Sequence, residues 1–427
     1  MADEEEEEGA RARELVLPAE VVALCKAVAR TRGAQGSLAA LAAAVRAQPV
    51  AVLERFFELI KFPVWVLVQH APSEAVRVAA LQCLAAVLAD LPFTGGARLT
   101  AVVTELTMVL DGKLSAGAPL SDEVAQAALD ALHAVAHGLA PAAMAAALVR
   151  DNFSPALGYA LAATLDRFKL SDARAVRVRA AEVLAALCRA VPEPAALRPF
   201  LPGVASGLAR ALAGDHKQGQ QVFVAALDAW GAAVVAALDS ADDAAVPAAG
   251  DAPDENSAPA QLQALLEPLL RNVAAHEAWR VREAAAALCG TLLRNCARTL
   301  VYATPTLVET LVLLCSDTYP AVSECAQTLL HEAAATVLSG DAASTALPAL
   351  LRENLTALIT TLPRLVTGTE PDKLRTLRLL RGYIDFLVSL SVFLTFILIF
   401  FIIVEEKKER EREREREKEQ KERKIDR

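Results

Sequence analysis

The chain has 427 residues, a formal net charge of −9 and an apolar content of 54% that is dominated by alanine, with only 5% aromatic residues. This length allows two or three ordinary domains or one long repeat array. No basic stripe occurs in the first 370 residues, which argues against a nucleic-acid-binding protein. Alanine favours helix over strand, and its small side chain lets helices pack closely.

The N-terminus opens with an acidic run from Asp3 to Glu8. This run is the opposite of the basic segment that begins a secretory signal peptide, so we expect no signal peptide. We expect residues 1–14 to form a disordered acidic tail.

Seven cysteines lie inside helical patterns, and none belongs to a Cys-x-x-Cys pair. Their odd number and scattered positions predict buried, unpaired thiols in a reducing compartment. They are Cys25, Cys83, Cys188, Cys289, Cys296, Cys315 and Cys325.

A repeated pattern organises the middle of the chain. Each copy has Val first, often Arg second, Ala at the fifth position, and further residues, mostly apolar, at the ninth and twelfth. These spacings place the side chains on one face of a helix. The steps between successive copies range from 41 to 59 residues, slightly longer than the roughly 40–47 residues of HEAT units. The copies start at Val76, Val124, Val176, Val222, Val281 and Val322.

One helix pair cannot bury its apolar face alone, whereas a stack of pairs can. We therefore predict an all-α fold, a HEAT/ARM-type α-solenoid of antiparallel helix pairs, over residues 15–384, with an irregular C-terminal tail. Each repeated pattern marks the inner helix of a pair. The predicted partner helices are Thr100–Leu110, Phe200–Leu212, Leu262–Val273 and Leu300–Cys315, and a further pair is expected at Leu347–Thr361 and Asp372–Tyr383.

Arginines occupy the second position of three copies, at Arg77, Arg177 and Arg282. In repeat folds such an arginine often donates to an acidic or carbonyl group of the adjacent repeat, here for example Asp172 or Asp317. We expect this ladder role, and the alternative is that these arginines bind a ligand.

Residues 239–260 contain six acidic residues, three prolines and no basic residue. This composition predicts a disordered acidic loop, and it accounts for the longest step between copies. The loop is either a spacer or a docking segment for a basic partner.

The C-terminal tail differs from the rest. The 19 residues from Phe386 to Val404 carry no charge, and a helix of that length spans about 28 Å, close to the thickness of a bilayer core. Residues 385–404 are therefore a candidate transmembrane helix with ends at Phe386 and Val404, and residues 405–427 are a charged, low-complexity tail. Basic residues on both sides leave the orientation open.

A second interpretation of the tail is that it derives from a retained intron or an alternative transcript end. Alanine is absent from residues 385–427, and residues 409–417 alternate Glu and Arg as a translated GA-dinucleotide repeat does. We expect a membrane association only if this tail is part of the protein.

No residues with a catalytic or cofactor-binding signature occur. The sequence lacks a Gly-x-Gly-x-x-Gly loop, a Walker loop, a Gly-x-Ser-x-Gly elbow and a His-Glu-x-x-His motif. His133 and His137 have the spacing of two metal ligands on one helix, but a zinc site needs three or four ligands, so ordinary packing is the preferred interpretation. We predict a non-enzymatic protein without cofactor or metal.

A polar segment, Gly214 to Gln220, interrupts the repeat pattern and contains Asp215, Lys217 and Gln218. The simpler interpretation is a tight turn in which Gly214 ends one helix and Asp215 caps the next. The alternative is a loop that carries function.

The chain resembles the N-terminal part of the Tel-two-interacting protein one family, and this polar segment belongs to the first of the stretches that carry the resemblance. Three stretches carry the resemblance in the family's order, with an acidic insertion between the first two, and the resemblance as a whole covers roughly residues 15–384. They lie at Phe200–Gly219, His276–Cys296 and Thr361–Tyr383, the last of which contains Arg364.

The resemblance implies a cytoplasmic and nuclear scaffold that joins Tel-two and Tti-two proteins in the TTT complex. It also implies the Hsp-ninety machinery with its R-two-TP adaptor as a partner. Its kinase clients would be phosphoinositide-kinase-like protein kinases such as mTOR, ATM and ATR, which connect it to TOR signalling, DNA damage checkpoints and telomeres. The candidate interaction or repeat-ladder residues are Arg77, Arg177, Asp215, Lys217, Gln218, Arg282 and Arg364.

Full-length members of that family are more than twice as long as this chain, so we expect a truncated form that lacks C-terminal assembly surfaces. The alternative function is a membrane-anchored HEAT-repeat adaptor that uses the tail. A HEAT adaptor of another kind, such as an import receptor or a phosphatase scaffold, is disfavoured by the irregular repeat steps.

Overall fold

The structure is a computed structural model. It describes residues 16–386, apart from residues 34, 90, 92, 94–95, 114–119, 151, 215–218, 240–257, 301, 339–353, 357, 361–368 and 371–372. All regular elements in this part of the chain are α-helices, which confirms the predicted all-α class. The chain divides into two compact units, residues 1–307 and 308–427.

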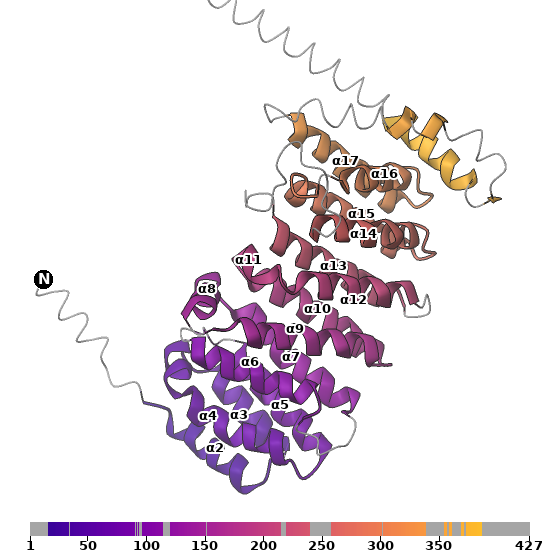
Figure 1. The fold of residues 1–427 in the computed structure, drawn as a ribbon. Coiled ribbons are helices and arrows are strands. Elements are labelled where there is room, and N and C mark those ends of the chain that lie inside the picture. The colour runs from indigo at the N-terminus through magenta and orange to yellow at the C-terminus, as the bar shows by residue number, and fades with distance from the viewer. Residues whose placement is uncertain are drawn as a thin grey trace, which may run out of the picture. The chain divides into compact units, whose positions relative to one another are not determined.

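The first unit consists of two helix layers (Figure 1). The motif layer holds α3 and the helices with the first five copies of the repeated pattern, and the partner layer holds the helix that precedes each of them. The partner layer contains α2 (Ala19–Arg30), α4 (Val50–His70), α6 (Gly96–Leu110), α9 (Ser154–Leu170), α12 (Leu201–Gly214) and α14 (Ala258–Ala274). The motif layer contains α3 (Gln35–Arg46), α5 (Glu74–Leu88), α7 (Asp122–Gly138), α10 (Arg174–Ala190), α13 (Gln220–Leu238) and α15 (Trp279–Cys296).

Contacts between the helices follow the predicted solenoid. Each motif-layer helix packs against the next one along the chain, from α3 to α15, and each also packs against the partner-layer helix that precedes it. In the partner layer, α2 contacts α4, and α6, α9, α12 and α14 contact one another in turn. Each pair therefore buries its apolar faces only with the help of its neighbours.

The alanines of the repeated pattern lie in the core, five of them in the motif layer and Ala326 in the second unit. The alanines at the fifth position of all six copies are completely buried, because a methyl side chain lets successive helices approach closely. They are Ala80, Ala128, Ala180, Ala226, Ala285 and Ala326.

Serine side chains fix where two of the motif-layer helices begin. Ser73 and Ser121 are the N-caps of α5 and α7, and their hydroxyl oxygens accept from the amides of Val76 and Val124. These bonds satisfy amides that have no partner inside the helix. The first valine of the pattern thus marks the first turn of the helix.

Two additional helices interrupt the regular pairs. Helix α8 (Pro141–Arg150) packs on α6, and the single-turn α11 (Pro194–Leu197) packs on α13. Because α8 lies between the third and fourth motif-layer helices, it accounts for the long step between Val124 and Val176. The sequence pattern did not predict either helix.

Helix α13 ends at Leu238 and α14 begins at Ala258. The last three residues of the predicted acidic loop 239–260 are therefore helical, while residues 240–257 lie outside the described residues. Among the described helices, α13 is long and apolar enough to cross a membrane, as is the bent pair of α7 and α8 if taken as one span. Helix α13 is mostly buried and packs against α10, α12 and α15, as a core helix does.

The second unit contains residues 308–315 of α16 (Thr304–Cys315), helix α17 (Pro320–Leu338) and a helix at residues 373–386. The helix at 373–386 corresponds to the predicted element Asp372–Tyr383. It packs on α16, where Gly382 contacts the main chain of Val312 and Arg375 forms an ion pair with Glu309 at 3.1 Å.

Phe386, the predicted start of a transmembrane helix, is the last described residue of this helix. Its side chain is buried and lies edge-on against the ring of His331 in α17, with ring centroids 5.1 Å apart. Val404 and residues 387–427 lie outside the described residues.

Candidate protein-interaction site

Arg177 connects the two helices of its own pair. Its Nε donates to the carbonyl oxygen of Phe168 at 2.9 Å, and its guanidinium lies over the Phe168 ring at 5.2 Å. Phe168 lies in the last turn of α9, where carbonyl oxygens lack partners within the helix. The expected carbonyl acceptor is therefore present, but it belongs to the preceding helix of the same pair.

Arg282 occupies the same pattern position in α15. Its terminal nitrogen donates to the carbonyl oxygens of His276 and Glu277, at 2.8 and 2.9 Å, in the loop that precedes the helix. Arg77 occupies this position in α5, and its Nε atom is buried and has no hydrogen-bond partner among the described residues. A role of these three arginines in a ladder between repeats, or in binding a partner, stays a prediction.

Four further candidate residues lie outside the described residues. Asp215, Lys217 and Gln218 fall in the segment between α12 and α13, and Arg364 precedes the last described helix. Next to the first segment, Gly219 has a φ of +88°, a conformation that favours glycine.

Other polar residues connect successive pairs of the first unit. Arg179 donates to Asp130 across α10 and α7 at 2.7 Å, and Ser171 donates to Asp122 at 2.7 Å. Arg98 of α6 donates to the carbonyl oxygen of Glu54 in α4 at 2.9 Å. The partners are 44 to 49 residues apart in sequence, about one repeat step, so these bonds are the ladder between neighbouring pairs.

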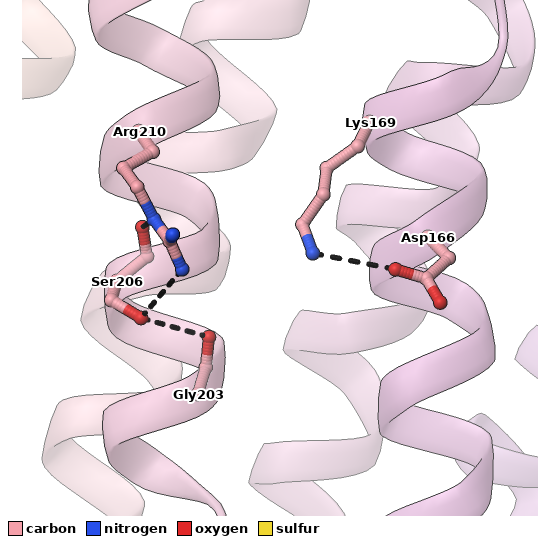
Figure 2. Close-up of polar contacts among 5 residues, drawn as sticks. All are labelled: Asp166, Lys169, Gly203, Ser206 and Arg210. Carbon is pink, nitrogen blue, oxygen red and sulfur yellow. Dashed lines mark hydrogen bonds and ion pairs between the residues drawn. The ribbon is translucent and has the colours of Figure 1, made fainter.

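The cations between α9 and α12 are held within their own helices. Lys169 pairs with Asp166 at 3.3 Å, and Arg210 donates to the carbonyl oxygen of Ser206 at 3.1 Å. Figure 2 shows the two interactions on neighbouring helices. Each interaction joins two residues of one helix, so these side chains lie along the surface of their own helices.

His133 and His137 lie side by side on α7. The rings of His133 and His137 lie 4.9 Å apart, and the described residues contain no group of three possible metal ligands. Burial lowers the pKa of His133, and the nearby Arg179 and His137 lower it further. His133 is therefore neutral at pH 7, as expected for a half-buried side chain next to a cation.

An exposed apolar surface lies on α4. Its side chains Leu59, Phe62 and Val66, here called the α4 stripe, are 50%, 71% and 38% exposed. Their spacing of three and four residues places them on one face of the helix. The opposite face carries buried residues such as Phe57, Ile60 and Val64. Helix α4 therefore has a second apolar face in addition to the one that forms the core.

A groove of about 520 Å³ runs beside the α4 stripe, between α4 and α6. Leu59, Phe62 and Trp65 supply its apolar lining, and the charged lining consists of Glu58, Lys61 and Glu105. Lys61 is 8% exposed and pairs with Glu105 of α6 at 2.7 Å. Apolar surface next to a few fixed charges is typical of sites that bind other proteins.

Sequence reasoning missed this surface. Leu59, Phe62 and Val66 follow the same helical period as the buried residues of α4, so a single pattern search does not separate the two faces. The sequence feature that indicates a second apolar face is the number of large apolar residues in α4, which is more than one buried face can hold.

A family model described as the TTI1 N-terminal TPR domain matches residues 20–318, which include all six helix pairs of the first unit. The chain belongs to the TTI1 family. This confirms the family resemblance inferred from the sequence.

Two curated relatives carry the name TELO2-interacting protein 1 homolog. The protein from Mus musculus is 26% identical over 373 residues, and the protein from Homo sapiens is 25% identical over 371 residues. Each alignment covers 78% of this chain and 34% of the relative. The chain thus spans about a third of the length of the curated relatives it matches.

Solved structures of repeat proteins show a similar helical architecture. A designed armadillo repeat protein has a TM-score of 0.41 at 17% identity, covering 63% of this chain and 98% of its own. The HEAT-like repeat protein from Thermococcus onnurineus has a TM-score of 0.37 at 14% identity, covering 76% and 97%.

Proposed function

We propose that this TTI1-family chain is a scaffold of the TTT type that holds other proteins on its stacked helix pairs. The observation that carries the proposal is the family match, which extends over the whole two-layer stack of the first unit. A stack of this kind offers long continuous surfaces and no enclosed reaction site. The names of the curated relatives suggest a TELO2-type subunit as the direct partner.

We extend the proposal to the further partners implied by the resemblance. These are a Tti-two-type subunit, the Hsp-ninety machinery, and kinase clients of the phosphoinositide-kinase-like class, in the cytoplasm and nucleus. The scaffold would act by keeping the client and chaperone proteins close together, without chemistry of its own. The elongated, locally stabilised repeat array supports this role because each pair can present its own surface.

Co-purification tests the proposal. The tagged full chain is expressed in cells, and TELO2-type and Tti-two-type subunits are measured in the eluate by quantitative mass spectrometry. We expect the TELO2-type subunit to be enriched over an untagged control. Recovery of the intact chain without either subunit would contradict the scaffold role for this chain.

A further inference from the structure

We propose that the α4 stripe and the groove beside it bind an amphipathic helix of a partner protein, one that carries basic residues next to its apolar face. The inference rests on the proposed scaffold function only in taking the partner to be a protein. It goes beyond that function by naming the surface and the chemistry of its ligand.

The apolar part of the surface fits a helix. Leu59, Phe62 and Val66 lie in one row along α4, and the half-buried Trp65 adds apolar surface to the groove on the side of α6. A partner helix with apolar residues at positions i, i+3, i+4 and i+7 can cover such a seam. Phe62 and Trp65 are the types of residue that contribute most to binding when a partner buries them.

The wall of the groove that α6 forms carries short side chains next to Glu105. On the face of α6 that carries Glu105, the residues one and two turns earlier are Ala101 and Ala97, both exposed. Their short side chains leave space above α6 next to the projecting ring of Phe62. A helix can therefore lie between the two walls with its apolar face down.

The charges select a basic partner. Lys61 is almost buried and is neutralised by Glu105, so a partner meets little positive charge from it. Glu58 is 65% exposed, and its ion pairs with Lys61 and Arg98 are long, at 3.9 and 3.8 Å. The three charged residues that line the groove, Glu58, Lys61 and Glu105, carry a net charge of −1, and Glu58 is the most exposed of them. A lysine or arginine beside the apolar face of the partner would pair with Glu58, whereas an acidic residue would be repelled.

The same carboxylates disfavour two other occupants. A second copy of the chain that paired stripe to stripe would bring the Glu58 side chains of both copies to the same interface, where like charges repel. An anionic membrane surface attracts basic segments and would be repelled by this groove.

Peptide binding tests the proposal on the purified full chain. Three fluorescein-labelled peptides of 18 residues are compared by anisotropy: a Leu/Lys amphipathic helix, a Leu/Glu helix with the same apolar stripe, and a Leu/Lys peptide whose order breaks the stripe. We expect the Leu/Lys helix to bind about tenfold or more tightly than either of the others.

Substitutions then locate the binding. Phe62→Ser should weaken binding of the Leu/Lys helix by about tenfold, and Glu58→Lys should weaken it while strengthening binding of the Leu/Glu helix. Leu170→Ser is the matched control, because Leu170 is 69% exposed on α9. Both serine variants replace exposed residues, and circular dichroism with thermal unfolding checks that they fold.

The proposal is wrong if Phe62→Ser binds the Leu/Lys helix as tightly as Leu170→Ser does, or if the stripe-breaking peptide binds as well as the helix. It is also wrong if sedimentation shows that the wild type is a dimer and that Phe62→Ser is a monomer. It is wrong, too, if the wild type binds anionic vesicles and Phe62→Ser does not. These outcomes leave co-purification of the TELO2-type subunit unaffected, so the failure of one proposal is separable from the failure of the other.

Discussion

Arg179 of α10 and Asp130 of α7 form an ion pair at 2.7 Å that joins two successive helix pairs. Arg179 also contacts Glu182 on its own helix at 2.9 Å, and Gln126 donates to the same Asp130 oxygen at 3.4 Å. Both partners of the pair are partly buried, so solvent screens them less than a fully exposed pair. The network therefore couples neighbouring repeats in addition to their apolar contacts.

A double-mutant cycle should detect this coupling. We expect Arg179→Ala and Asp130→Ala each to lower the free energy of unfolding, with an interaction free energy of about 1 kcal/mol between them. Urea unfolding at low salt measures the cycle, and 1 M salt should reduce the coupling. Strictly additive effects at low salt would show that the pair contributes nothing between repeats.

Arg177 should stabilise the pair of α9 and α10 through its hydrogen bond to the Phe168 carbonyl oxygen and the contact of its guanidinium with the Phe168 ring. Arg177→Leu removes the bond to the Phe168 carbonyl and should cost about 1–2 kcal/mol in the free energy of unfolding. Arg177→Lys should recover only part of this loss, because an ammonium cannot reproduce the stacked geometry. Arg150→Ala, at an exposed site, is the control, and equal unfolding free energies for Arg150→Ala and Arg177→Leu would contradict the role.

The repeat pattern predicted most of the fold because the same physical requirement recurs in each pair. Ala128 and Ala180 are completely buried since motif-layer helices must approach closely, and that requirement leaves a readable spacing. The first pair, α2 and α3, lacks the Val-Arg pattern and was not separated from its surroundings. Helix α8 was missed because an insertion between pairs obeys no repeat spacing.

The candidate site was less predictable. The Nε of Arg177 donates to the carbonyl oxygen of Phe168 in the same pair, an acceptor that the repeat spacing alone does not identify, and a role of this arginine between repeats stays a prediction. The α4 stripe depends on which of two apolar faces the neighbouring helices cover. That choice is made by packing with α2 and α5, and one helix's periodicity contains no information about it.

Buried thiols should make stability fall at alkaline pH. Burial raises the pKa of Cys188 to about 12, above the value of 9 for a free thiol. Above pH 9 the unfolded chain loses this proton while the folded chain keeps it, so the folded state loses stability as the pH rises from about 9 toward 12. Below pH 9 both states hold the proton and the effect is absent.

Comparison with Cys188→Ala isolates the contribution of this one thiol. Urea unfolding at pH 8 and pH 10 should show the wild type losing about 1.4 kcal/mol more than the variant over this interval. The cavity left by the variant costs the same at both pH values and cancels. Equal losses in the two proteins would mean that Cys188 ionises in the folded state as it does in the unfolded one.

Gly382 should be required for the packing of the last described helix on α16. A Cβ atom at this position would collide with the carbonyl oxygen of Val312, and backbone cannot move aside as a flexible side chain can. We expect Gly382→Ala to destabilise the second unit by about 1–3 kcal/mol. Gly203 in α12 is the matched control, since a Cβ there meets nothing within 4 Å, and Gly203→Ala should stabilise by about 0.5 kcal/mol. Hydrogen exchange of residues 308–315 measures the local effect: faster exchange in Gly382→Ala alone is expected, and unchanged exchange would mean that the close approach of Gly382 to Val312 is not required.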